Sequence, residues 1–145
     1  EFFTLVKEHL TEDGVMVVNM NMRGSGEGSI NEHLADTISS VFGEVYTVDV
    51  RNTTNRELFA SDNPQMIDNL TVHSKKLADE NLLSMMETVS GNLTAYEAGD
   101  YIMSDDKAPV ELLGMQVIDE LIRDEVAYYK KIYEEQGVQG VINAL

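Results

Sequence analysis

A short, uninterrupted apolar run, Val15-Met16-Val17-Val18, constrains the fold of this chain more than any other segment. Four apolar residues without polar alternation are typical of a strand that is buried on both faces, as in a parallel sheet. A helix-like stretch at 2–10 precedes the run. After a glycine-rich loop, Ser29 is suited to cap a second helix, with Glu32 as its capping-box partner. The succession of helix, strand and helix predicts an α/β fold.

Two further strands are expected in the first half of the chain. Residues 45–50 are β-branched and alternate in polarity, which predicts a strand. After a short polar turn, residues 57–60 are expected to fold back beside it as the second arm of an antiparallel hairpin. The apolar spacing then changes to that of helices, which predicts one or two helices within 64–89. A long helix is expected at 109–136, ended by Gly137.

The charge balance limits the classes of partner. Ten basic and twenty-six acidic residues give a net charge of −16, so nucleic-acid phosphates would be repelled and no nucleic-acid partner is expected. An acidic surface attracts cations such as polyamines, although solubility alone explains such a surface. No stretch approaches the ~18 consecutive apolar residues of a membrane span. The chain has no cysteine and three histidines without metal-ligand spacing, so no metal site is expected.

The glycine-rich loop allows a second interpretation. Gly24, Gly26 and Gly28 lie between the apolar run and the second helix, and Asp49 follows about 20 residues later, as in nucleotide-binding fingerprints. The first glycine, however, does not follow the apolar run directly, and Glu27 would repel a phosphate. We favour a surface loop, and keep a self-contained domain that binds S-adenosylmethionine or a nucleotide as the alternative.

Four segments of the chain resemble spermidine synthase-like proteins, particularly the bacterial type that is fused to a membrane-embedded, transporter-like region. The most specific is Asp105-Asp106-Lys107-Ala108-Pro109-Val110-Glu111, which is similar to an Asp-Asp-x-Ala-Pro-Val-Glu stretch near the end of many such proteins. The other three segments are 1–10, 14–19 and 55–60. Together the four cover about residues 1–115 in the family's order.

This resemblance implies the C-terminal half of a class I methyltransferase-like (Rossmann-like) sheet. Residues 15–21 would be the fifth strand and 45–50 the sixth. Residues 56–60 would be the seventh strand, antiparallel and inserted between the other two. In this arrangement residues 1–62 form the C-terminal half of the α/β domain, and 63–145 form a helical extension of the same domain.

The family transfers an aminopropyl group from decarboxylated S-adenosylmethionine to a polyamine. The groups that hold this co-substrate, and the aspartate that deprotonates the attacking amine, would lie before Glu1. The resemblance therefore implies no catalytic residue and no bound cofactor in this chain. Positioning and proton removal are the main contributions of such an enzyme, so we expect no turnover by the chain alone. We expect a cytoplasmic location and a parent protein attached to the membrane through an upstream region.

Some contacts to the polyamine acceptor are still expected. Asn19 and Asn21 end the presumed fifth strand, at the edge of an open α/β sheet where ligands gather, although plain strand-end capping is the simpler explanation of both residues. Asp105, Asp106 and Glu111 enter the long helix, where carboxylates suit an ammonium group but also favour helix N-termini. A non-enzymatic acidic domain that senses polyamines or contacts a partner is the remaining alternative.

The presumed fifth strand also has a consequence for assembly. Without the strand that precedes it in the family, residues 15–21 form an exposed apolar edge, which is a template for pairing with another chain. We expect the missing N-terminal half of the domain as its natural partner. For the isolated chain we expect a homodimer through this edge.

Overall fold

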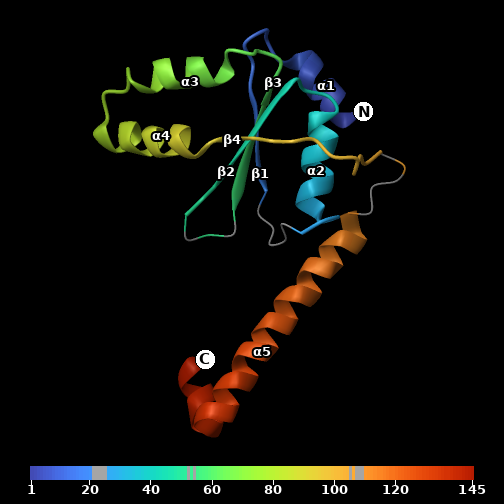
Figure 1. Cartoon of the computed structure of the whole chain (residues 1–145), viewed down its shortest axis with the longest axis vertical. Helices are drawn as coiled ribbons and strands as arrows, with labels where there is room; N and C mark the ends of the chain where they lie inside the picture. The colour runs from blue at the N-terminus through green and yellow to red at the C-terminus, as the bar shows by residue number, and fades with distance from the viewer. Residues whose placement is uncertain (21–25, 52, 54, 105, 107–109) are drawn as a thin grey trace. The chain divides into compact units, whose positions relative to one another are not determined.

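The computed structural model describes residues 1–20, 26–51, 53, 55–104, 106 and 110–145. The chain divides into two compact units, residues 1–108 and residues 109–145. The first unit contains a four-stranded sheet with helices around it, and the second is a helix with one break (Figure 1). The expected mixed α/β character is therefore confirmed.

The sheet has the strand order β1-β3-β2-β4. Its strands are β1 (Met16–Met20), β2 (Glu44–Asp49), β3 (Arg56–Ser61) and β4 (Thr94–Ala95). Strand β3 is antiparallel to both β1 and β2 and lies between them, so β1 and β2 run parallel without touching. The position expected for residues 56–60 is thus the one observed. Strand β4, which pairs with β2, was not expected from the sequence.

Strand β1 is not buried on both faces, which corrects the expectation from its apolar run. It lies at an edge of the sheet, and its residues alternate between covered and exposed positions. Met20 is buried, whereas Val17 is 54% exposed. The cause is packing: helices cover one face of the strand, whereas the second face opens on a groove.

Helices α1 (Phe2–His9) and α2 (Ile30–Ser39) pack against the core of the first unit. Ile38 on α2 and Leu58 and Ala60 on β3 are fully inaccessible to solvent. Burial of an isoleucine or leucine side chain contributes about 1.5–3 kcal/mol, so Ile38 and Leu58 stabilise the packing of α2 on the sheet. The whole cluster comprises Met20, Ala35, Ile38, Phe42, Val45, Leu58 and Ala60.

The start of α2 follows the predicted capping residues with one difference. The Ser29 hydroxyl accepts a hydrogen bond from the Glu32 amide (3.3 Å). The Glu32 carboxylate, however, accepts from the Gly28 amide (2.5 Å), because the Ser29 amide donates to the carbonyl of Gly26 instead. Gly28 adopts a φ of 72°, which glycine tolerates without a steric penalty. The cap therefore fixes the loop in front of the helix as well as the helix itself.

The second half of the first unit supplies two helices, α3 (Met66–Ser74) and α4 (Glu80–Asn92), which pack on each other. Helix α3 begins two residues later than Pro64 suggests, because the Asn63 side chain accepts from the Gln65 amide and closes a turn first. Asp79 caps α4 by accepting hydrogen bonds from two amides of its first turn.

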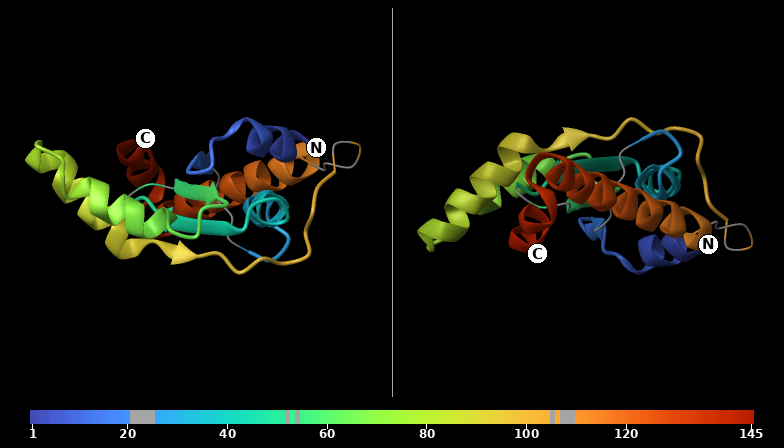
Figure 2. Two further views of the ribbon diagram at one scale, coloured as in Figure 1. Left: turned by 90° about the horizontal axis from the view of Figure 1, so that it is seen from above. Right: turned by 90° about the horizontal axis from the view of Figure 1, so that it is seen from below.

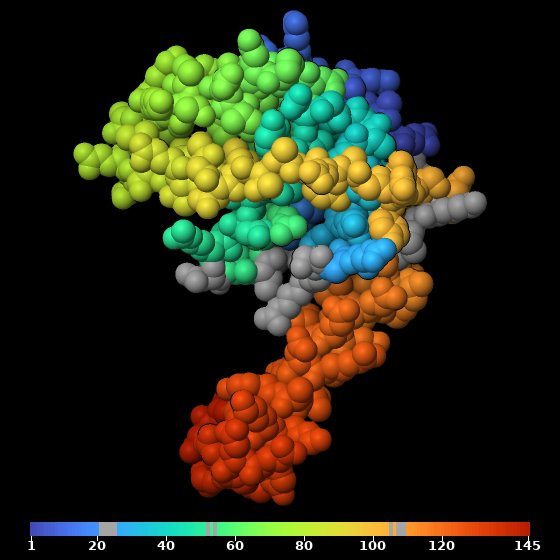
Figure 3. Space-filling view, in the orientation of Figure 1, coloured from blue at the N-terminus to red at the C-terminus, as the bar shows by residue number. Residues whose placement is uncertain are grey.

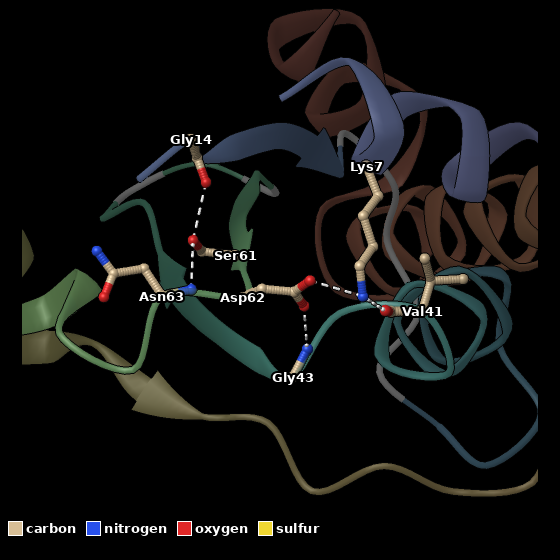
Figure 4. Close-up of polar contacts among 7 residues, drawn as sticks. All are labelled: Lys7, Gly14, Val41, Gly43, Ser61, Asp62 and Asn63. Carbon is tan, nitrogen blue, oxygen red and sulfur yellow. Dashed lines mark hydrogen bonds and ion pairs between the residues drawn. The ribbon is translucent and has the colours of Figure 1, made fainter. Parts of the chain in front are cut away.

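A polar cluster joins α1 to the loops at one end of the sheet (Figure 4). The Lys7 ammonium lies 2.7 Å from the Asp62 carboxylate and donates to the Val41 carbonyl at 2.7 Å. The other oxygen of Asp62 accepts from the Gly43 amide (3.0 Å). These contacts hold the helix-to-strand loop after α2 against the end of β3.

The second unit consists of α5 (Val110–Ala144). Gly137 interrupts it with φ 67° and ψ −166°, a conformation that essentially only glycine adopts. The regular helix thus breaks where the sequence predicts, and a short helical piece follows. Among the residues described in the two units, no helix is both long and apolar enough to cross a membrane.

Candidate functional site

A segment that we call the strap, residues 94–103, crosses one face of the first unit and is fastened to α2 (Figure 3). Its anchor is Asp36, which is only 1% exposed. One carboxylate oxygen of Asp36 accepts from the Tyr96 hydroxyl (2.7 Å) and from the Gly99 amide (2.9 Å), and the other accepts from the Tyr101 amide (2.9 Å). A single carboxylate therefore satisfies three donors of the strap.

The hydrogen bonds to Asp36 determine which of Asp36 and Tyr96 is ionised. Burial by itself would raise the pKa of Asp36, but the bonds from Tyr96, Gly99 and Tyr101 outweigh it and hold this pKa below its usual range. Burial, followed by the hydrogen bond to the Asp36 carboxylate, raises the pKa of the Tyr96 hydroxyl well above its ordinary value. Asp36 is therefore a carboxylate and Tyr96 a neutral donor at neutral pH.

A small polar cavity lies beside this anchor, at the carboxyl end of β1 and the start of α2. Its volume is about 110 Å³. The lining residues are Met20, Ser29, Asn31, Glu32, Ala35, Thr47, Arg56 and Tyr96. A larger cavity of about 670 Å³ lies at the other end of β1, next to Lys7 and Asp62. We favour the smaller cavity because ligands of open α/β sheets bind at the carboxyl ends of strands.

The charges around the small cavity favour a cation over an anion. Arg56 binds Asp49 in a two-pronged contact, with Nε to Oδ1 at 2.5 Å and Nη2 to Oδ2 at 3.1 Å. This hydrogen bonding to Asp49 raises the pKa of Arg56, and the bond from Arg56 lowers the pKa of Asp49. The positive charge of Arg56 is thus balanced by Asp49. Glu32 and the nearby Asp36 then leave two negative charges around the cavity. Such a balance attracts an ammonium group and repels a phosphate.

The size of the cavity limits what it can hold. Sites for complete small molecules typically measure about 300–1,000 Å³. A cavity of about 110 Å³ is suited to one end of a slender ligand, such as an aminoalkyl group. Tyr96, which forms part of its wall, is held by Asp36, so the strap and the cavity are mechanically linked.

Within the described part of the first unit, the structure does not bring the predicted acceptor residues to this cavity. Asn19 is exposed on β1, opposite Glu57 of β3. Asp106 is exposed in the first unit, and Glu111 is exposed in the first turn of α5 in the second unit. Neither Asn19 nor Asp106 lines the cavity. Asn21 and Asp105 lie outside the described residues, and the polyamine-binding role of all five stays a prediction.

The residues of the nucleotide-binding alternative are partly engaged with other groups. The Gly28 amide donates to Glu32, and both oxygens of Asp49 accept from Arg56. Gly26 is exposed with open space around it, and Gly24 lies outside the described residues. Among the described residues, no group of three acidic or histidine side chains is placed to hold a metal ion.

Sequence reasoning missed the residues that build the cavity and its anchor. The sequence marks Glu32 only as a capping residue, and Arg56 only as part of a resembling segment and of the strand expected at 56–60. Asp36 and Tyr96 gave no signal, because an acid on a helix and a tyrosine in a loop are usually solvent-exposed. The contact between them joins positions 60 residues apart, which local periodicity cannot reveal.

Comparison with known proteins gives one relationship. The chain aligns over its whole length with a probable polyamine aminopropyl transferase of Bifidobacterium longum (strain NCC 2705), with 45% identity across 162 residues. The chain spans 36% of the length of that relative. No protein-family model matches the chain, and no solved structure matches it. The resemblance to spermidine synthase-like proteins is thus confirmed, whereas fusion to a membrane region stays a prediction.

Proposed function

We propose that this chain is the C-terminal part of a polyamine aminopropyltransferase and helps to hold the amine acceptor of that enzyme. The observation that carries the proposal is the 45% identity to a probable polyamine aminopropyl transferase, which extends over the whole chain. The chain spans 36% of that relative, and we therefore assign the activity to the longer protein.

The strand order supports a place late in a class I methyltransferase-like sheet. In that fold the seventh strand is inserted antiparallel between the fifth and the sixth. Strand β3 lies in this way between β1 and β2. The groups that bind decarboxylated S-adenosylmethionine, and the base that deprotonates the amine, would then come from the portion before β1.

The polar cavity supports a contribution to the acceptor side. An aminopropyl transfer needs a neutral amine that points at the carbon next to the sulfonium, while the rest of the polyamine remains cationic. Glu32, together with the Asp36 carboxylate behind Tyr96, gives the cavity the negative charge that a distal ammonium group requires. In this proposal the chain positions one end of the polyamine and performs no proton transfer.

The acceptor role is tested by calorimetric titration of the purified chain with spermidine. We expect spermidine to bind and a Glu32→Gln substitution to weaken binding, since glutamine preserves the capping hydrogen bond but removes the charge. Glu87→Gln is the matched control, because Glu87 is an exposed residue of α4 and its replacement changes the net charge equally. If both variants lost the same spermidine affinity, general surface charge would explain the binding, and the acceptor role would be overturned.

The enzymatic role is tested by a chimera in which this chain replaces the matching stretch of the Bifidobacterium longum relative. We expect aminopropyl transfer from decarboxylated S-adenosylmethionine by the chimera and none by the chain alone. Turnover by the chain alone, or micromolar binding of S-adenosylmethionine or NAD to it, would instead support the self-contained nucleotide-binding alternative.

A polyamine-sensing role without catalysis is the second candidate. The net charge of −16 and the Glu32 carboxylate in the wall of the cavity favour it independently of any reaction. Spermidine binding by the isolated chain, combined with an inactive chimera, is the outcome that would select this role.

A further inference from the structure

One aromatic side chain limits the size of the small polar cavity. Among the described residues that line this cavity of about 110 Å³, Tyr96 is the one aromatic residue and the one residue of the strap. The walls contributed by α2 and β2 include the short side chains of Ala35 and Thr47. The extent of the cavity on the side of the strap is therefore set by the ring of Tyr96.

Tyr96 is fastened at both ends. Its amide donates a hydrogen bond to the Val45 carbonyl of β2 (2.9 Å), and its hydroxyl donates to Asp36 of α2 (2.7 Å). Between these two bonds Tyr96 packs against the hydrophobic core. A hydrogen bond to a carboxylate is stronger than one between neutral groups, and the ring cannot leave the wall without breaking it. The cavity thus has a fixed wall on this side.

The wall formed by Tyr96 is independent of the part of the sheet that the proposed function places before β1. Tyr96 directly follows β4, and β4 and β1 are at opposite ends of the described sheet. Figure 2 shows the strap beside α2 in both views, on the side of the first unit that lies away from α1. The ring, its anchor and the other lining residues all belong to this chain.

We propose that Tyr96 determines which amines this site accepts. Its ring ends the cavity after one unbranched aminoalkyl end with a primary ammonium group, and it excludes ends that carry a further alkyl group on the nitrogen. This inference rests on the proposed function, because it assigns the cavity of that function to a narrower class of ligand. Tyr96 is in this sense a specificity-determining residue, and Asp36 positions it.

Shape and hydrogen bonding both favour a primary ammonium group. Such a group has three N–H donors, and Glu32 and Thr47 bring a carboxylate and a hydroxyl to the lining of the cavity. An alkyl group on the nitrogen removes one donor and enlarges the same end of the ligand. Protein interiors are close-packed, so the fixed wall cannot yield to this added volume without cost. One methylene too many in a fitted pocket typically costs roughly 10–200-fold in discrimination.

Two amines of equal charge test the proposal. Calorimetric titration of the purified chain compares spermidine with a derivative that carries an ethyl group on each terminal nitrogen and remains equally cationic. We expect the unmodified chain to bind spermidine about ten-fold more tightly than the derivative, or more. Tyr96→Ala removes the wall, so the two affinities should become nearly equal. A change in general charge or in stability alone would not alter this ratio.

Tyr101→Ala is the matched control. Tyr101 also belongs to the strap, but it does not line the cavity, and its ring lies against His33 with 4.8 Å between the centroids. This variant should keep the ratio of the unmodified chain. Tyr96→Phe retains the ring and should keep the preference for spermidine as well. Tyr96→Leu retains an apolar contact with the core and should give an intermediate ratio, which preserves the test if Tyr96→Ala does not fold.

The possible failures are distinguishable. If spermidine binds but the unmodified chain does not discriminate, or if Tyr96→Ala or Tyr96→Leu folds and discriminates as well as the unmodified chain, the role of Tyr96 is wrong and the acceptor role stands. Loss of the preference in Tyr96→Phe would contradict a role for the ring itself. If neither amine binds to the unmodified chain, the acceptor role fails and this inference fails with it.

Discussion

The hydroxyl of Tyr96 donates a 2.7 Å hydrogen bond to Oδ1 of Asp36, across 60 positions of sequence. This contact joins the strap to α2, next to the cavity that we assign to an amine. The same carboxylate accepts from two backbone amides of the strap. The position of the cavity wall therefore depends on one buried acid.

Replacing that acid with its amide should release the strap. In Asp36→Asn the new NH₂ group faces donors, so at least one of the strap's donors loses its acceptor. We expect a loss of about 2–3 kcal/mol in the free energy of unfolding, the usual cost of breaking buried hydrogen bonds to a charged group. Urea unfolding measures the loss. Hydrogen exchange at Gly99 and Tyr101 should accelerate more than exchange in β3, and uniform acceleration would contradict a local role for Asp36.

The contribution of Asp36 to stability should depend on pH in a defined direction. Its pKa in the folded protein lies below the ordinary value, so its contribution is fully present above the unfolded pKa of about 3.9. The contribution is lost as the pH falls through the folded pKa. The difference in unfolding free energy between the parent chain and Asp36→Asn should therefore be constant near neutrality and shrink below about pH 4.

Other carboxyl groups do not disturb this comparison. The hydrogen bond from Arg56 lowers the pKa of Asp49, and the bond from Lys7 lowers the pKa of Asp62, but both residues are present in the parent and in the variant. Their effects cancel in the difference. If the difference in unfolding free energy grew as the pH fell, the pKa of Asp36 would be raised by folding and not lowered, and the prediction would be wrong.

The strand order could be predicted because local patterns and the family resemblance pointed to the same arrangement. The alternation at 45–50 and the polar turn after it predict a hairpin, and β2 and β3 form one. Strand β4 could not be found in this way, because two residues are too short to show a period and β4 depends on its pairing with β2. The prediction that β1 is buried on both faces is wrong for a related reason. An apolar run shows that burial of these side chains would be favourable, but whether another element packs on both faces depends on the rest of the fold.

The candidate site could be predicted much less well. The expected acceptor residue Asn19 is exposed on the edge strand, whereas the cavity is built by Glu32, Arg56 and Tyr96. These three residues come from α2, β3 and the strap, and only the fold brings them together. In the nucleotide-binding alternative the spacing assigns Asp49 to the fingerprint, whereas in the structure Asp49 binds Arg56. A spacing rule cannot distinguish these partners.

Ser61 should contribute more to stability than its size suggests. It is fully buried, donates to the Gly14 carbonyl (2.8 Å) and accepts from the Asn63 amide (3.1 Å) (Figure 4). Ser61→Ala leaves both backbone groups without this partner, so we expect a loss of about 1–3 kcal/mol in urea unfolding. Ser39→Ala is the control: within the described part of the chain its buried hydroxyl has no hydrogen-bond partner, so its removal should be neutral or stabilising. Equal losses in the two variants would contradict the role of the Ser61 network.

Lys7 should stabilise the junction of α1 with the sheet through a specific contact and not through its charge alone. Its ammonium contacts Asp62 and the Val41 carbonyl, each at 2.7 Å, and lies 5.8 Å from the centre of the Phe42 ring. The pair is partly exposed, so Lys7→Met, which keeps the apolar stem, should lower the unfolding free energy by only about 1 kcal/mol.

Added salt should reduce this difference, because it screens the ion pair but not the bond to the carbonyl. Lys130→Met is the matched control, since Lys130 lies 3.9 Å from Glu134 on an exposed helix surface and should contribute within about 0.5 kcal/mol of zero. If both methionine variants lost the same amount, the geometry at Lys7 would have no special value and overall charge would explain its effect.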